Sequence, residues 1–207
     1  MLNSSLSLCQ SFVFEQLLQK WARYGINKEQ GFSYESMNHD WTVNATGRIR
    51  LLTQCRQLYT FSHACQLEEK HEWHEKLSPL FNFITNHFFQ EDRWIFSLND
   101  DLSIQQEQSD AYALAFVLLS FSHYYQVTKD DKALYYMKET HRFLLKNMQA
   151  KTGGFHETFP VEVQEIRRQN PHMHLLEGYI SAFNTTQDEK YKDIITSLLT
   201  LVLERFY

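Results

Sequence analysis

The chain has 207 residues and a formal net charge of −5, with 20 Lys and Arg against 25 Asp and Glu. This acidic balance argues against a general nucleic-acid binder, which normally presents a basic face. The sequence contains 6 Gly and 3 Pro, and 15% of it is aromatic, which disfavours a Gly-rich phosphate loop or a sandwich of many short strands. We therefore expect a mostly helical fold with a sizeable core.

Apolar residues recur at helical spacing along almost the whole chain, which predicts seven helices. The expected helices span about residues 5–24, 45–67, 69–89, 106–127, 130–148, 171–185 and 188–207. The fourth helix is apolar on nearly all sides, whereas the third, fifth and seventh helices each carry a charged side. Such an alternation of inner and outer helices is typical of helical hairpins stacked into a toroid or solenoid.

The chain shows no pattern of a membrane span or of a secretory signal. Its longest apolar run, Ala111–Leu119, has nine residues, whereas about 20 are needed to cross a bilayer. No basic region precedes an apolar stretch at the start. We expect the three cysteines to be reduced. These observations predict a cytoplasmic protein that contacts neither membrane nor nucleic acid.

The densest group of reactive side chains lies at residues 167–177, which read RRQNPHMHLLE. Asn170 followed by Pro171 predicts a helix start, with the amide as N-cap and the proline at the first helical position. His174 and Glu177 then share one face of this helix because they are three residues apart. A lone helical histidine is usually a packed or surface residue, but this combination favours a functional role for His174.

A metal site is not indicated. His172 lies about 200° around the helix from His174, so the two cannot serve one site through the same geometry. His156 and Glu177 add ligand chemistry, but no HExxH or CxxC spacing fixes a tetrahedral site. We therefore expect no metal ion and no other cofactor.

Three segments carry a family resemblance: Gln54–Ser62, Asp110–Phe116 and Asn170–Glu177. In order and spacing they resemble motifs of the N-acylglucosamine 2-epimerase family, and the third has the form typical of its mannose isomerase and aldose–ketose isomerase branch. This resemblance implies an all-α ring of twelve helices, an (α/α)6 barrel around a sugar-binding pocket. With about seven helices, residues 1–207 would be a single domain that forms the N-terminal half of such a barrel.

The resemblance also implies roles for individual side chains. Arg56 and His174 would be catalytic, with the guanidinium placed where negative charge develops on the substrate oxygens. Substrate-binding roles fall on further residues of the motifs and of the loop near the entrance: Asn170, Tyr112, Glu177, His172 and Trp41. The family's acid and base histidines lie in the half that this chain lacks, and His156 is not their counterpart. Taken alone, Arg56 also fits a helical salt bridge and Tyr112 also fits core packing.

The implied reaction is a 1,2 proton shift through an enediolate, as in the interconversion of mannose and fructose. One alternative is a catalytically inactive half-toroid that binds a sugar or another protein. Another is a glycoside hydrolase or lyase with two opposed carboxylates. Asp110, Glu157 and Glu177 offer such groups, but their spacing selects no pair.

An incomplete ring would leave apolar helix faces uncovered, and large apolar patches are rare on soluble monomers. We therefore expect a homo-oligomer, or a partner chain that completes the barrel around a monosaccharide.

Overall fold

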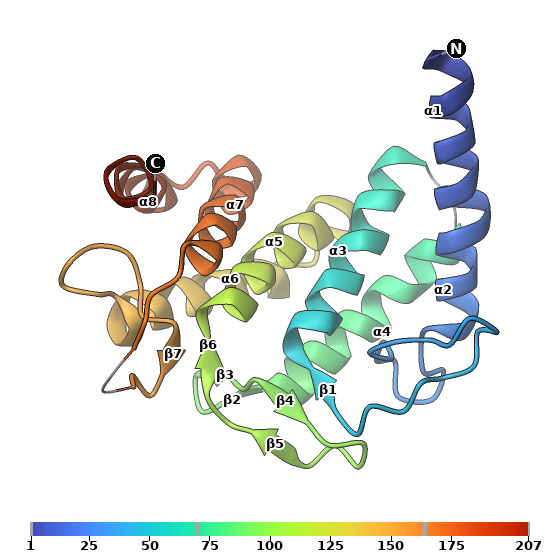
Figure 1. Cartoon of the computed structure of the whole chain (residues 1–207), viewed down its shortest axis with the longest axis horizontal. Coiled ribbons are helices and arrows are strands. Elements are labelled where there is room, and N and C mark those ends of the chain that lie inside the picture. Colours follow the sequence, from blue (N-terminus) through green and yellow to red (C-terminus); the bar gives the residue numbers. More distant parts are fainter. Residues whose placement is uncertain (1, 69–70, 163–164, 207) are drawn as a thin grey trace.

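The computed structural model describes residues 2–68, 71–162 and 165–206, and its helices form an open arc (Figure 1). Its helical elements are α1 (Leu2–Gln10), η1 (Ser11–Leu17), α2 (Leu18–Tyr24), α3 (Leu51–Leu67), α4 (His71–Phe88), α5 (Ala111–Thr128), α6 (Asp131–Phe143), η2 (Leu144–Met148), α7 (Gln169–Thr186) and α8 (Glu189–Arg205). The π-helical stretches η1 and η2 continue their neighbours, so the described helices fall into seven rods, as expected. No helix among these residues is long and apolar enough to cross a membrane.

Two layers of helices build the arc. Helices α3, α5 and α7 lie side by side, and α4, α6 and α8 each pack on the inner helix that precedes them (Figure 1). Because α5 contacts α3, α6 and α7 at once, it is apolar around nearly its whole circumference. Helices α5 and α7 approach very closely at Gly178, where an added Cβ would lie 2.6 Å from the Ala115 carbonyl oxygen.

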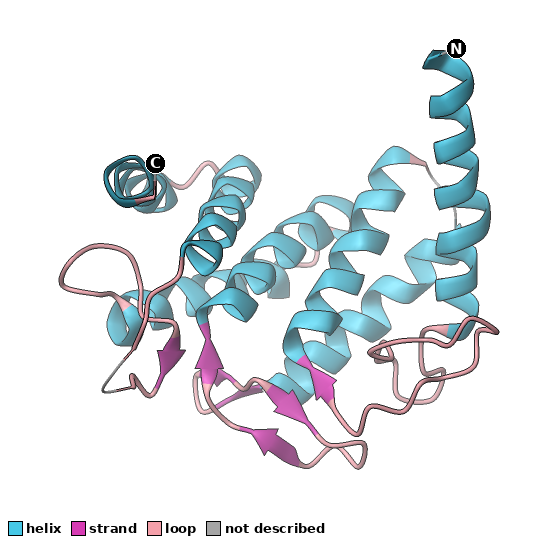
Figure 2. Cartoon of the chain, in the orientation of Figure 1, coloured by secondary structure: helices cyan, strands magenta, loops and turns pink. Residues whose placement is uncertain are grey.

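Short strands border the N-terminal ends of the inner helices (Figure 2). They are β1 (Ile49–Arg50), β2 (Phe89–Gln90), β3 (Arg93–Trp94), β4 (Ser97–Leu98), β5 (Ile104–Gln106), β6 (Ser109–Asp110) and β7 (Thr158–Phe159). All pairings are antiparallel: β1–β4–β5 form one sheet, and β2–β3 and β6–β7 form two-stranded pairs.

These strands correct two predicted helix starts. Helix α3 begins at Leu51 rather than near residue 45, because Ile49 pairs with Leu98 in the small sheet. Helix α5 begins at Ala111 rather than near residue 106, because Ser109 pairs with Phe159. The Asp110 side chain then accepts the Ala113 N–H at 2.8 Å and caps the helix.

The core lies between the two layers and is rich in aromatic rings. Phe81 stacks on Tyr124 with ring centroids 4.3 Å apart, which joins α4 to α5. Trp94 is fully buried, and its indole N–H donates to the Thr140 hydroxyl at 2.8 Å. This hydrogen bond satisfies the buried indole and joins β3 to α6.

Candidate functional site

Side chains from all three inner helices meet at the N-terminal end of the inner face. We call this group the Arg56 cluster: Arg56 of α3, Tyr112 and Phe116 of α5, and His174 and Glu177 of α7. Arg56 Nη2 donates to the Tyr112 hydroxyl at 2.6 Å, and the guanidinium lies 4.5 Å from the Phe116 ring centroid. The His174 ring centroid lies 5.0 Å from those of both aromatic rings. The structure therefore brings together four side chains that the sequence placed in one site.

His174 is oriented by its neighbour on the next turn. Its Nδ1 lies 2.9 Å from Glu177 Oε2. A carboxylate can only accept a hydrogen bond, so Nδ1 carries the proton and Nε2 is the ring's remaining hydrogen-bonding atom. This arrangement sets the tautomer with which the imidazole meets a ligand.

Arg56 keeps its charge free for a ligand. The side chain is exposed, and among the described residues no carboxylate lies within ion-pair distance of it. Its contacts are a phenol oxygen and two aromatic faces, which hold a cation without neutralising it. A planar guanidinium in this setting can donate paired hydrogen bonds to oxyanions.

Asn170 lies one turn before His174 on the same face of α7, with its side chain exposed. It is not the N-cap that the sequence predicted, because the helix begins at Gln169 and Arg168 is the capping residue. The Glu157 carboxylate, distant in the chain, accepts the Arg168 backbone N–H instead. The Asn170 amide is consequently not used to cap the helix.

His172 is not brought to the Arg56 cluster. It is 1% exposed, and both ring nitrogens are occupied: Nδ1 lies 2.8 Å from the Arg168 carbonyl oxygen, and Nε2 accepts the Phe155 N–H at 3.1 Å. Its expected role in substrate binding is thus replaced by a structural one, which follows from its place on the opposite side of α7.

Trp41 also lies apart from the Arg56 cluster, in the loop between α2 and β1. Its ring is perpendicular to that of Trp21, with centroids 6.4 Å apart, and the Lys20 ammonium lies 5.2 Å from its centroid. Its φ of 67° is in the left-handed region, which costs a side chain about 1–2 kcal/mol.

A second polar group lies further along the same inner face. We call it the Gln66 layer: His63, Gln66, His123, Gln126 and Thr185. Gln66 donates to Gln126 Oε1 at 2.9 Å, and Gln126 donates to the Thr185 hydroxyl at 2.6 Å. The Nδ1 atoms of His63 and His123 lie 3.3 Å and 3.1 Å from Gln66 Oε1, so both rings donate to one oxygen. This layer joins α3, α5 and α7.

Tyr59 connects the two groups. Its ring stacks on His63 at 5.6 Å and meets His123 edge-on at 4.8 Å. Burial raises the pKa of Tyr59, and nearby Glu177 raises it further. Burial lowers the pKa of His123 to about 4; His63 lowers it too, whereas Glu177 raises it. His123 is therefore neutral at physiological pH.

The carboxylates considered for hydrolysis have structural partners. Glu157 is 7% exposed and binds the Arg168 side chain, with its Oε2 2.6 Å from Nε. Asp110 caps α5, and burial raises its pKa. Both carboxylates are thus bound within the protein, which favours structural roles for them.

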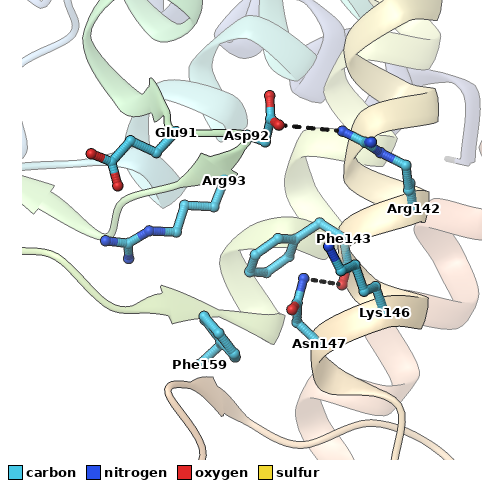
Figure 3. A pocket seen from close by; sticks show the side chains of 8 residues that line it. All are labelled: Glu91, Asp92, Arg93, Arg142, Phe143, Lys146, Asn147 and Phe159. Atoms are coloured by element: carbon cyan, nitrogen blue, oxygen red, sulfur yellow. Dashed lines mark hydrogen bonds and ion pairs between the residues drawn. The ribbon is translucent and has the colours of Figure 1, made fainter.

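A cavity of about 310 Å³ lies between the β2–β3 turn, the outer helix α6 with η2, and β7, and shares no residue with the Arg56 cluster. Figure 3 shows its lining side chains. The cavity is lined by Glu91, Asp92, Arg93, Arg142, Phe143, Lys146, Asn147 and Phe159. Arg93 is paired with Glu107, and Arg142 with Glu139 and, at 3.7 Å, with Asp92. These guanidinium groups are neutralised within the protein, unlike that of Arg56.

Two side chains of the candidate site, Phe116 and His63, were not singled out as site residues from the sequence. Phe116 follows Tyr112 by four residues on α5, and His63 follows Arg56 by seven on α3, so each continues a helix face that was already singled out. Extending those faces by one or two turns would have found them. Within the described residues, no group of three or more His, Cys, Asp or Glu side chains is arranged to hold a metal ion.

A model of the N-acylglucosamine 2-epimerase (GlcNAc 2-epimerase) family matches residues 31–207. A cellobiose 2-epimerase of Bacteroides fragilis is 23% identical over 208 residues, covering 92% of this chain and 53% of that protein. A D-mannose isomerase of Marinomonas mediterranea is 25% identical over 177 residues, covering 81% of this chain and 43% of that protein.

The fold is shared with a solved relative. The structure of a cellobiose 2-epimerase from Bacillus thermoamylovorans B4167 matches with a TM-score of 0.91 at 22% identity, covering 99% of this chain and 57% of that one. This likeness confirms the expected all-α fold, a partial (α/α)6 barrel. The chain spans about half the length of the curated relatives that it matches.

Proposed function

Because the chain belongs to the N-acylglucosamine 2-epimerase family, we propose that it forms the substrate-binding wall of a sugar isomerase or epimerase. The observation that carries this proposal is the Arg56 guanidinium, held by the Tyr112 hydroxyl beside His174 with no described carboxylate to neutralise it. An unneutralised guanidinium next to an oriented imidazole is suited to an uncharged substrate that becomes anionic during the reaction.

Sugar isomerisation and epimerisation both create such an anion. Each begins when a proton leaves C2 of the open-chain aldose, which places negative charge on the oxygens of an enediolate. Arg56 would donate hydrogen bonds to these oxygens and stabilise them by a few kcal/mol. His174, through Nε2, and Asn170 would hold sugar hydroxyls. In this proposal the groups that remove and return the proton lie on the opposite wall of the barrel.

The two reactions differ only in the carbon that is reprotonated. Return of the proton to C1 gives a ketose, as in mannose–fructose isomerisation, and return to the other face of C2 gives the epimer. We favour the isomerisation because the segment Asn170–Glu177 has the form of that branch and a D-mannose isomerase is among the relatives. Similarity to a cellobiose 2-epimerase supports the alternative, epimerisation.

Incubation with sugars in D₂O, read by NMR, tests the proposal. Mannose, glucose, fructose, N-acetylmannosamine and cellobiose should be compared, on the assembly in which the chain occurs. With an aldose as substrate, deuterium at C1 of a newly formed ketose identifies an isomerase, and deuterium at C2 of the epimeric aldose identifies an epimerase. His174→Ala should reduce the exchange about a hundredfold.

Exchange that survives both His174→Ala and Arg56→Ala would refute the proposal. Sugar binding by calorimetry without any exchange would instead identify the inactive, sugar-binding half-toroid. Both variants should be compared with the wild-type chain by circular dichroism, so that a loss of fold is not mistaken for a loss of function.

We also propose that a second copy or a separate chain closes the arc. Large apolar side chains are exposed at its two ends, such as Leu8 (72%) and Phe12 (52%) near the start of the chain and Leu203 (68%) near its end. Covering such side chains favours association. Size-exclusion chromatography with light scattering should show a species larger than the monomer at micromolar concentration, and a clean monomer would contradict this proposal.

A further inference from the structure

A cavity of about 380 Å³ is formed by the loop between η2 and α7, the first turn of α7 and the C-terminal end of α8. We call it the Arg167 cavity; it is lined by Thr152, Arg167, His172, Leu201, Arg205 and Phe206. It shares no residue with the Arg56 cluster, and His172 lies on the side of α7 opposite to His174. Its volume is within the range of small-molecule binding clefts.

The Arg167 side chain is held in place without being neutralised. Its Nη1 donates to the Gly153 carbonyl oxygen, and its Nη2 donates to the Thr152 hydroxyl at 2.6 Å. Both acceptors are uncharged, and the Glu157 carboxylate is paired with the neighbouring Arg168 instead. Arg167 therefore keeps its positive charge, and its remaining N–H groups are available to a ligand.

Arg205 brings a second guanidinium to the cavity from the last turn of α8. Its side chain is exposed and, within the described part of the chain, makes no ion pair or hydrogen bond. The described residues that line the cavity include no Asp or Glu. Two positive charges therefore line one cavity of a chain whose net charge is −5, and an anion between them would be attracted by both.

The other polar groups of the lining strengthen this preference for an anion. The Thr152 hydroxyl accepts from Arg167, so its own proton can be donated to a ligand. Both ring nitrogens of His172 are already occupied, by the Arg168 carbonyl oxygen and the Phe155 N–H. The lining thus offers a ligand N–H and O–H donors, which suit the acceptor-only oxygens of an oxyanion.

The rest of the lining is apolar and closely packed. The ring centroids of His172 and Phe206 are 5.9 Å apart. Gly154 has a φ of 68°, and a Cβ there would lie 2.7 Å from Leu201 Cδ2 and 2.6 Å from His172 Nε2, so only glycine lets the loop lie this close. A ligand in the cavity therefore meets an apolar surface beside the two guanidinium groups, which a small inorganic ion would not use.

We propose that the Arg167 cavity binds a small organic carboxylate that has an apolar body. Its carboxylate lies between Arg167 and Arg205, and its body packs on Leu201 and Phe206. A carboxylate has two oxygens to divide between two guanidinium groups, and its single charge costs less to remove from water than the double charge of a phosphate. This inference does not depend on the proposed function, because the cavity and the Arg56 cluster have no residue in common.

The Nε–H signals of arginine in ¹⁵N-labelled chain test the site, with phenylpropionate as the probe. The signals are assigned by single Arg→Lys variants. Phenylpropionate should shift the signals of Arg167 and Arg205 and leave that of Arg142, which lines a different cavity, in place. Phenylpropanol has the same body without the charge, and inorganic phosphate has charge without the body. Each should bind at least about tenfold more weakly than phenylpropionate.

A pair of matched variants tests the role of the second guanidinium. Arg205→Gln should weaken phenylpropionate binding about tenfold and leave the fold intact, because this side chain is exposed and unpaired within the described part of the chain. Arg23→Gln is the control: it removes an exposed arginine from the last turn of α2, changes the net charge equally, and should leave the affinity unchanged.

Four results would overturn the inference. The first is an Arg205 signal that stays in place up to the solubility limit of phenylpropionate, and the second is an affinity that Arg205→Gln and Arg23→Gln change equally. The third is phenylpropanol binding as tightly as phenylpropionate, which would show that the guanidinium groups are not used. The fourth is equally tight binding of inorganic phosphate, which would identify a general anion site in place of the proposed carboxylate site.

Discussion

The inner face and the outer cavity both present guanidinium groups, but their surroundings differ. On the outer side, Arg142 is bound to Glu139 and Asp92, and Arg93 to Glu107. On the inner face, Arg56 is bound to a phenol oxygen and aromatic rings. The partner of a cation, rather than its presence beside a cavity, thus decides whether its charge is available to a ligand.

The largest effect is expected at the two arginines. Arg56→Ala should lower the rate of deuterium exchange into sugar at least about a hundredfold, because it removes the group placed to stabilise the enediolate. Arg142→Ala should change that rate less than about twofold, because it breaks only the ion pairs of a largely exposed guanidinium outside the Arg56 cluster. Both rates are measured by NMR in D₂O. Equal effects of the two changes would remove the distinction between the inner face and the outer cavity.

A smaller effect, on stability, is expected at two carboxylates. Glu157→Ala leaves the Arg168 N–H without its acceptor and removes a carboxylate that is only 8% exposed, which should lower the free energy of unfolding by about 3 kcal/mol. Glu107→Ala removes a carboxylate that is 65% exposed, so its cost should stay below about 1 kcal/mol. Urea unfolding at neutral pH compares them, and a larger loss for Glu107→Ala would contradict the burial argument.

The smallest effect concerns pH. Burial lowers the pKa of His123 on the inner face to about 4, and that of His141 in the outer layer also to about 4. Unfolded histidine titrates near 6.5, so the unfolded chain binds more protons between these values and stability falls as the pH drops from about 6.5 to 4. For His123, which is half-buried, we expect about 1 kcal/mol after allowing for solvent screening.

Substitution of each histidine measures its contribution to this loss of stability at acidic pH. His123→Gln and His141→Gln should each reduce the difference in unfolding free energy between pH 7 and pH 4.5, as determined by urea unfolding. The larger reduction is expected for His141, which is 8% exposed and packed against the Tyr179 and Tyr191 rings. If this difference in unfolding free energy is unchanged in both variants, other groups cause the loss of stability at acidic pH.

The periodicity of apolar residues predicted the seven helical rods because burial against a second layer imposes that period directly. It failed where short strands precede a helix. Ile49 and Ser109 belong to two-residue strands, too short to show alternation, and their partners Leu98 and Phe159 are distant in the chain. No local pattern could reveal these pairings.

The candidate site was predictable only where its residues lie in local sequence motifs. Tyr112 and His174 lie in recognisable motifs, whereas Asn170 does not cap α7: the helix starts one residue earlier, and the distant Glu157 accepts the backbone N–H of the N-cap residue Arg168. The meeting of His63 and His123 depends on how α3 and α5 are rotated against each other, which only the packed structure fixes.

The missing side chain of Gly178 has a consequence for motion. Because Gly178 has no Cβ, α7 contacts the α5 backbone at Ala115, and such close packing makes the two helices one rigid unit. Neither α3 nor α5 contains a glycine, so side chains separate their backbones. The contact at Gly178 therefore holds Tyr112 of α5 and His174 of α7 in a fixed relation to each other.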